Sequence, residues 1–82
     1  MTTFLVEAYA PAGVDLAEVE ARAQAAAAAL AGDGIAVHYV RPILVPGDET
    51  CFHLIESGSE AGVVELIRRA ALSFIRIVET RP

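Results

Sequence analysis

A short polar segment in the middle of the chain, Pro46 to Glu49, constrains the fold more than any other feature. It separates two runs, Ile35 to Val45 and Thr50 to Glu56, whose β-branched and aromatic content is typical of strands. Proline, glycine and aspartate favour turns, so the segment predicts a hairpin loop that makes these two strands antiparallel neighbours. Pro42 cannot donate a ladder hydrogen bond, so we expect the first of these strands to lie at a sheet edge or to contain a bulge.

The hairpin is flanked by one strand and one helix on each side. The predicted elements are a strand over Phe4 to Tyr9, a helix capped by Asp15, a helix capped by Ser59 that runs to about Leu72, and a strand over Ser73 to Thr80. Glu18 follows Asp15 by three residues, which resembles a capping box, and Gly32 stops the helix. The apolar side of the second helix is predicted to consist of Val63, Val64, Ile67, Ala70 and Ala71.

This order, βαββαβ, predicts an α+β fold in a single domain that spans residues 1–82. The economical arrangement is a four-stranded antiparallel sheet in the order 4-1-3-2, with both helices on one face. The other face would then be open. We expect it to carry the side chains of Leu5, Tyr9, Ile55 and Val78 beside those of Glu7, His53 and Arg76.

Composition indicates that this open face is covered by a second subunit. Hydrophobic residues make up 55% of the chain, and a lone domain of 82 residues has little interior in which to bury them. We therefore predict a homodimer, formed through the open face or an adjoining sheet edge.

Charge and cysteine content exclude several classes of protein. A net charge of -5 makes nucleic acid and anionic membrane surfaces poor partners. One cysteine, Cys51, excludes an intramolecular disulfide. The first residues do not resemble a signal peptide, and the apolar run from Ala23 to Ala31 is too short to cross a membrane. We expect a reduced, cytoplasmic protein.

Four side chains are candidate metal ligands. Cys51 and His53 are two residues apart on one strand and therefore share a face, and Glu7 on the first strand could add an oxygen. A regular hairpin places His53 opposite Pro42, so His38 lies about 13 Å further along the strand. The two histidines then belong to separate sites, or a second subunit contributes. The alternatives are a buried hydrophobic role for Cys51, a hydrogen-bonded core or interface role for His53 and a surface role for His38.

A different class of function uses the same region. Tyr9, Glu7, His53 and Arg76 could line a pocket on the open face of a small dimeric enzyme or of a small-molecule-binding protein. Glu7 and Arg76 are equally well explained as a charge pair between neighbouring strands. Phosphate-binding glycine motifs are absent from the sequence.

The segment from Arg41 to Glu56, with its core Asp48 to His53, resembles the signature of a family of short actinobacterial proteins. These are the Streptomyces-type nickel-binding proteins, formerly a domain of unknown function. Phe4 to Tyr9 and Phe74 to Glu79 are similar as well, so the resemblance spans essentially the whole chain. It implies a ferredoxin-like subunit, a homodimer, and binding of Ni²⁺ near the dimer surface for sequestration or detoxification.

Residues and resemblance together favour a non-catalytic metal-binding protein. From the chemistry of nickel, His38 and His53 are the first candidate ligands, and Cys51 and Glu7 are the second. Protonation of the imidazoles near pH 6 should release the metal.

Overall fold

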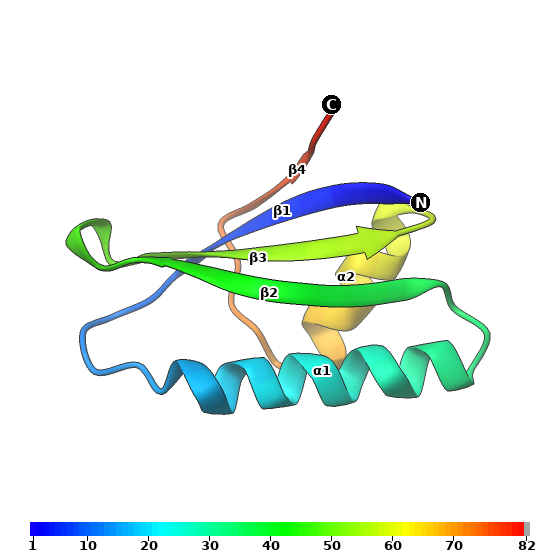
Figure 1. Ribbon diagram of the computed structural model, residues 1–82, viewed down its shortest axis with the longest axis horizontal. Helices are drawn as coiled ribbons and strands as arrows, with labels where there is room; N and C mark the ends of the chain where they lie inside the picture. The colour runs from blue at the N-terminus through cyan, green and yellow to red at the C-terminus, as the bar shows by residue number, and fades with distance from the viewer. Residues whose placement is uncertain (82) are drawn as a thin grey trace.

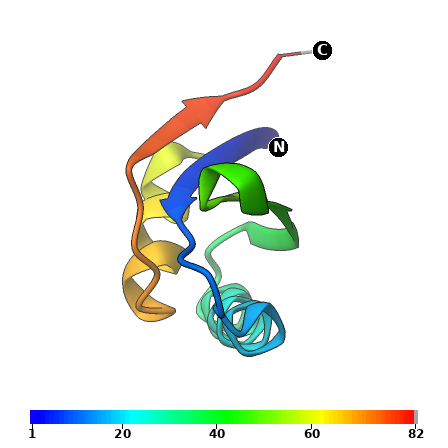
Figure 2. The same cartoon turned by 90° about the vertical axis from the view of Figure 1, so that its left-hand side faces the viewer.

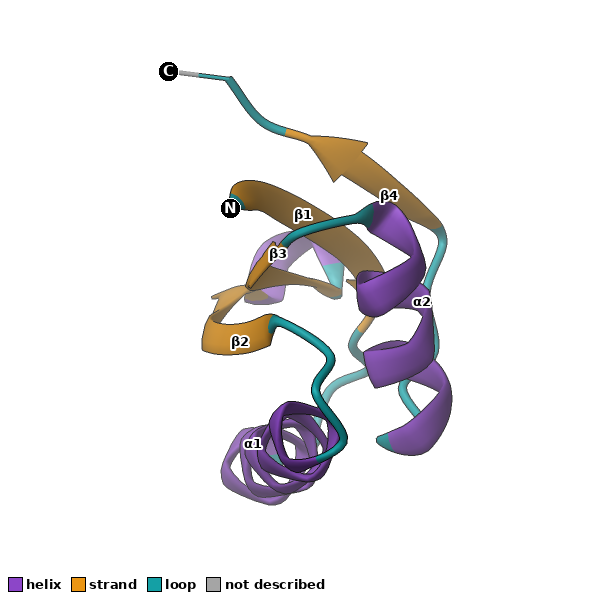
Figure 3. Cartoon of the chain, turned by 90° about the vertical axis from the view of Figure 1, so that its right-hand side faces the viewer, coloured by secondary structure: helices purple, strands orange, loops and turns teal. Residues whose placement is uncertain are grey.

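The computed structural model describes residues 1–81 as an antiparallel sheet with two helices on one side (Figure 1). The elements are β1 (Thr2–Tyr9), α1 (Leu16–Gly32), β2 (Val37–Val45), β3 (Thr50–Ser57), α2 (Glu60–Arg69) and β4 (Arg76–Glu79). The sheet order is β2-β3-β1-β4, which is the predicted order 4-1-3-2 in reverse. Seen along the strands in Figures 2 and 3, both helices lie on the same side of the sheet. The predicted α+β fold is therefore confirmed.

The β2–β3 hairpin has the features that its sequence predicts. Its loop is a short 3-10 turn, Pro46–Asp48, and Glu49 closes it in the left-handed region with a φ of 47°. Val45 pairs with Thr50, and Pro42 pairs with His53. β2 is an edge strand, and its register shifts between Tyr39 and Arg41, which leaves Val40 as a bulge.

The first helix packs lengthwise beneath the sheet, as Figure 1 shows. The Asp15 side chain accepts a hydrogen bond from the Glu18 backbone N–H at 3.1 Å, so the predicted N-cap is present. The buried side of α1 is mostly alanine, which allows the helix to approach β2 closely. Its buried residues are Ala23, Ala26, Ala27 and Leu30.

The second helix is shorter than predicted, and Val63, Ile67 and Ala70 of its predicted apolar side are buried, whereas Val64 and Ala71 are not. It ends at Arg69, because Ala71 adopts a left-handed conformation with a φ of 55°. Leu66 is fully buried, whereas Val64, which was predicted to be part of the apolar side, is 44% exposed. The inward face follows the spacing of Val63, Leu66 and Ile67, and Val64 lies one residue off that stripe.

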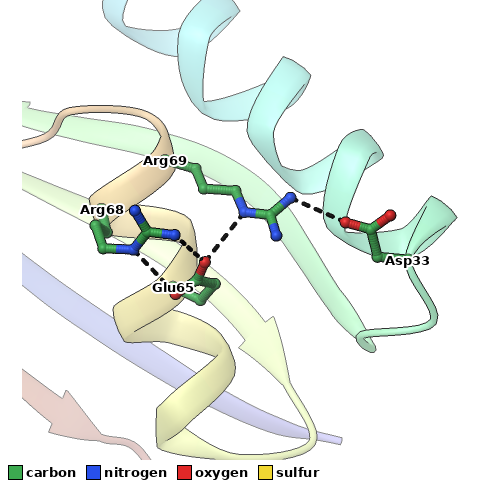
Figure 4. Close-up of polar contacts among 4 residues, drawn as sticks. All are labelled: Asp33, Glu65, Arg68 and Arg69. Atoms are coloured by element: carbon green, nitrogen blue, oxygen red, sulfur yellow. Dashed lines mark hydrogen bonds and ion pairs between the residues drawn. The ribbon is translucent and has the colours of Figure 1, made fainter.

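An ion-pair network joins α2 to the end of α1 (Figure 4). Glu65 accepts from the guanidinium groups of Arg68 and Arg69, and Arg69 Nη1 also donates to Asp33 Oδ2 at 3.0 Å. These hydrogen bonds hold the pKa of Glu65 at about 2. The pairs are largely exposed, so each contributes little to the free energy of unfolding.

The strand register corrects the predicted composition of the open face. His53 pairs with Val6, Ile55 pairs with Phe4, and directly paired residues of an antiparallel ladder share a face. Val6 and Phe4 are in the core under the helices, so His53 and Ile55 point into the core and not onto the open face. The alternation within β1 and β3 and the pairing of β2 with β3 at the hairpin were predicted correctly, but the register of β3 against β1 was not.

Candidate functional site

The open face of the sheet has an apolar centre crossed by one ion pair. Cross-strand pairs place its apolar side chains together, and these are Leu5, Leu54, Phe52, Ile43 and Val78. Glu7 Oε1 lies 2.8 Å from Arg76 Nε on the neighbouring strand, so the predicted charge pair is present. Glu7 therefore already has a cationic partner on this face.

His38 lies at the rim of this face, directly opposite Glu56 on β3. The His38 side chain is exposed and that of Glu56 is partly exposed. Directly opposed residues have Cβ atoms about 4.5–5.5 Å apart, so the imidazole and the carboxylate are close enough to bind the same ion or molecule. Sequence reasoning missed Glu56. A regular hairpin places His38 opposite Ser57 and on the face of His53, but the bulge at Val40 shifts the register by one residue and moves His38 to the open face.

His53 lies on the opposite, helix-covered face and is only 2% exposed. Its ring Nδ1 is 2.7 Å from the hydroxyl of Tyr39, which is itself fully buried on β2. Burial lowers the pKa of His53 and raises that of Tyr39, so both side chains are neutral near pH 7.

Cys51 also points into the helix-covered side, at 3% exposed. Burial raises the pKa of its thiol, so the sulfur is protonated near neutral pH. Cys51 and His53 line a common cavity of about 250 Å³ that also contacts Tyr9 and Arg22. A pocket is therefore present near two of the four residues predicted to form one, but behind the sheet instead of on its open face.

The four predicted metal ligands are thus divided between two faces. Glu7 and His38 lie on the open face, whereas Cys51 and His53 lie on the covered face. Within residues 1–81, no three histidine, cysteine, aspartate or glutamate side chains are close enough to hold a metal ion together. A complete metal site would need water molecules or a second subunit.

Comparison with known proteins gives one informative match. Family models and curated proteins yielded no match to this chain. A crystal structure of SCO4226 from Streptomyces coelicolor A3(2) aligns with a TM-score of 0.74 and 22% identity, and the alignment covers 98% of this chain and 96% of that one. This small actinobacterial protein is therefore similar in fold over its whole length. Along the described part of this chain, no helix is long and apolar enough to cross a membrane.

Proposed function

We propose that the protein binds a divalent transition metal, Ni²⁺ in particular, without catalysing a reaction. The observation that carries this proposal is the cross-strand pair of His38 and Glu56 at the rim of the open face. An imidazole nitrogen and a carboxylate oxygen, completed by water, suit nickel. The resemblance of the sequence to the nickel-binding family supports the choice of metal.

Exposure and charge favour the rim over the other candidate positions. A cation can reach His38 and Glu56 without displacing packed side chains, and neither has an ion-pair partner among residues 1–81. Cys51 and His53 are buried with their protons in place, and Glu7 is engaged by Arg76. The net charge of -5 raises the local concentration of cations around the protein.

We also propose a homodimer that forms through the open face. No element of residues 1–81 covers the apolar centre of this face, and burial of such a patch favours association. In a two-fold arrangement, the rim donors of one subunit could complete the metal site of the other. A monomer mass at micromolar concentration by analytical ultracentrifugation would refute the dimer.

We propose a cytoplasmic location. Cys51 is a buried free thiol, which is typical of a protein in a reducing compartment.

Calorimetric titration with Ni²⁺ tests the metal site. We expect the wild type to bind, and we expect His38→Ala and Glu56→Gln to weaken binding by at least about tenfold, since each removes one donor. His53→Ala should bind as the wild type does, because that ring is on the other face. An absence of binding heat in the wild type would refute the function, whereas weakened binding in His53→Ala alone would move the site to the covered face.

Acidification gives an independent test of imidazole ligation. A protonated imidazole has no lone pair for a metal, so the affinity for Ni²⁺ should fall on acidification. In His38→Ala this loss should be much smaller. Equal pH dependence in both proteins would contradict ligation by His38.

A further inference from the structure

The cavity behind the sheet lies where the end of β1 leads into α1. Its walls are mainly apolar and come from β1, β3 and α1, from the segment between β1 and α1, and from the segment after α2. Apolar wall residues include Ala10, Val14, Leu16, Val19 and Leu72. At about 250 Å³ it is slightly smaller than the sites that hold drug-sized molecules, which start near 300 Å³.

The ring of His53 supplies one polar group of this cavity. Nδ1 is engaged by Tyr39, whereas Nε2 has no hydrogen-bond partner among residues 1–81, and the ring lines the cavity. The Tyr39 hydroxyl has no other acceptor among those residues. A buried hydroxyl hydrogen without an acceptor costs about 1–3 kcal/mol, so Tyr39 donates to Nδ1. The proton of the neutral imidazole is then on Nε2, which makes this nitrogen a donor.

Arg22 lines one side of the cavity. Its Nη1 donates to the carbonyl oxygens of Ala70 and Ala71 at 2.9 and 3.2 Å, and its Nε forms an ion pair with Glu18 Oε1 at 2.8 Å but donates no hydrogen bond to residues 1–81. Its charge is therefore balanced within the chain. A buried anionic ligand would have no cation of its own, and burial of an unpaired charge is costly.

We infer that this cavity binds a small, uncharged, largely apolar organic molecule whose carbonyl oxygen accepts a hydrogen bond from His53 Nε2–H. The apolar walls take the body of the molecule, and the imidazole fixes its orientation. A metal ion does not suit this position, because the ring nitrogen would first have to lose its proton. This site is separate from the proposed metal site, since it lies on the other face of the sheet.

Two-dimensional ¹H–¹⁵N NMR titration with acetophenone tests the inference. Toluene, which has no acceptor, and benzoate, which is charged, are the matched probes. We expect acetophenone to shift the amide signals of Cys51, His53 and Leu72 and to bind at least about tenfold more tightly than either matched probe. Long-range ¹⁵N spectra of the ring should show the Nε2–H tautomer. Equal affinity for acetophenone and toluene, shifts that map elsewhere, or an Nδ1–H tautomer would each overturn the inference.

Variants separate the donor from the cavity itself. His53→Phe keeps an aromatic ring but removes the donor, so acetophenone affinity should fall to that of toluene. The same substitution at the other histidine, His38→Phe, should leave acetophenone affinity unchanged. If His53→Phe does not fold, Ser73→Trp provides a second test. It places a large side chain at an exposed position of the cavity wall and should reduce the binding of acetophenone and of toluene. Unchanged binding in Ser73→Trp together with unchanged or unmeasurable binding in His53→Phe would overturn the inference.

Discussion

The side chain of Ser57 stabilises the connection from β3 to α2 and requires glycine at position 62. The Ser57 hydroxyl donates to the carbonyl of Ala36 at 3.2 Å and accepts from the backbone N–H of Ser59 at 3.3 Å. It occupies the space in which a Cβ on Gly62 would lie, so α2 can approach the sheet only with glycine at that position.

Gly62→Ala should therefore destabilise the protein. The added methyl displaces the Ser57 hydroxyl and costs about 1–3 kcal/mol in the free energy of unfolding, which urea denaturation measures. Gly58→Ala is the control, because a Cβ there meets nothing within 4 Å. An equal effect of the two substitutions would contradict the steric explanation.

His53 makes a second residue-scale prediction, on the pH dependence of stability. Burial lowers its folded pKa below the ordinary value of 6.5, so on acidification the unfolded chain binds a proton before the folded chain does. The stabilising contribution is complete above about pH 6.5 and is lost as pH falls through the interval down to the folded pKa. Urea denaturation across pH 5 to 8 should show this decline in the wild type and a flatter profile in His53→Phe. Identical profiles would rule out the buried imidazole as its source.

At the scale of the element, α2 ends with the hydrogen bonds of a Schellman motif. Ala71 N–H donates to the carbonyl of Arg68 at 3.2 Å, and Leu72 N–H donates to that of Ile67 at 3.0 Å. Ala71, which is the C′ residue of this motif, has a φ of 55°. Glycine is the usual residue there, because it adopts this conformation without steric cost.

Ala71→Gly should stabilise the protein. Relief of the left-handed strain is worth about 1 kcal/mol, and thermal denaturation should show a higher midpoint. The matched control is Ala25→Gly at an exposed position inside α1, which should lower stability by about 0.5–1 kcal/mol. A loss of stability in Ala71→Gly would show that the end of α2 is not strained.

At the scale of the whole molecule, both helices cover one face of the sheet, and no other part of the described structure covers the apolar centre of the opposite face. The same face has the His38–Glu56 pair at its rim. The two proposals made for this face, a homodimer and a metal site, are therefore physically linked. If the partner subunit supplies metal ligands, loss of the dimer must weaken metal binding.

Leu54→Glu tests this link. A carboxylate in the centre of the open face should repel its counterpart across a two-fold interface, so the variant should sediment as a monomer and bind Ni²⁺ at least about tenfold more weakly. Val64→Glu, on the exposed side of α2, should leave both properties as in the wild type. A monomer that keeps full nickel affinity would show that one chain and water complete the site.

Much of the architecture could be predicted from the sequence, because the features that decide it are local. Asp15 and Ser59 cap their helices, and Pro46 to Glu49 turns the chain, within a few residues of each signal. The period of two in β1 and β3 identified which residues share a face within one strand. Pro42 predicted that β2 lies at a sheet edge or contains a bulge, and both features are present.

The candidate sites depended on the tertiary structure, because a shift of one residue between strands exchanges the two faces of a sheet. The pairing of His53 with Val6 turns its ring toward the helices and the hydroxyl of Tyr39. The bulge at Val40 turns His38 the other way, toward Glu56. Alternation along the sequence determined which side chains go together within a strand. Only the packing of the helices and the register of the ladder decided which of those sets is buried and which remains open to a ligand.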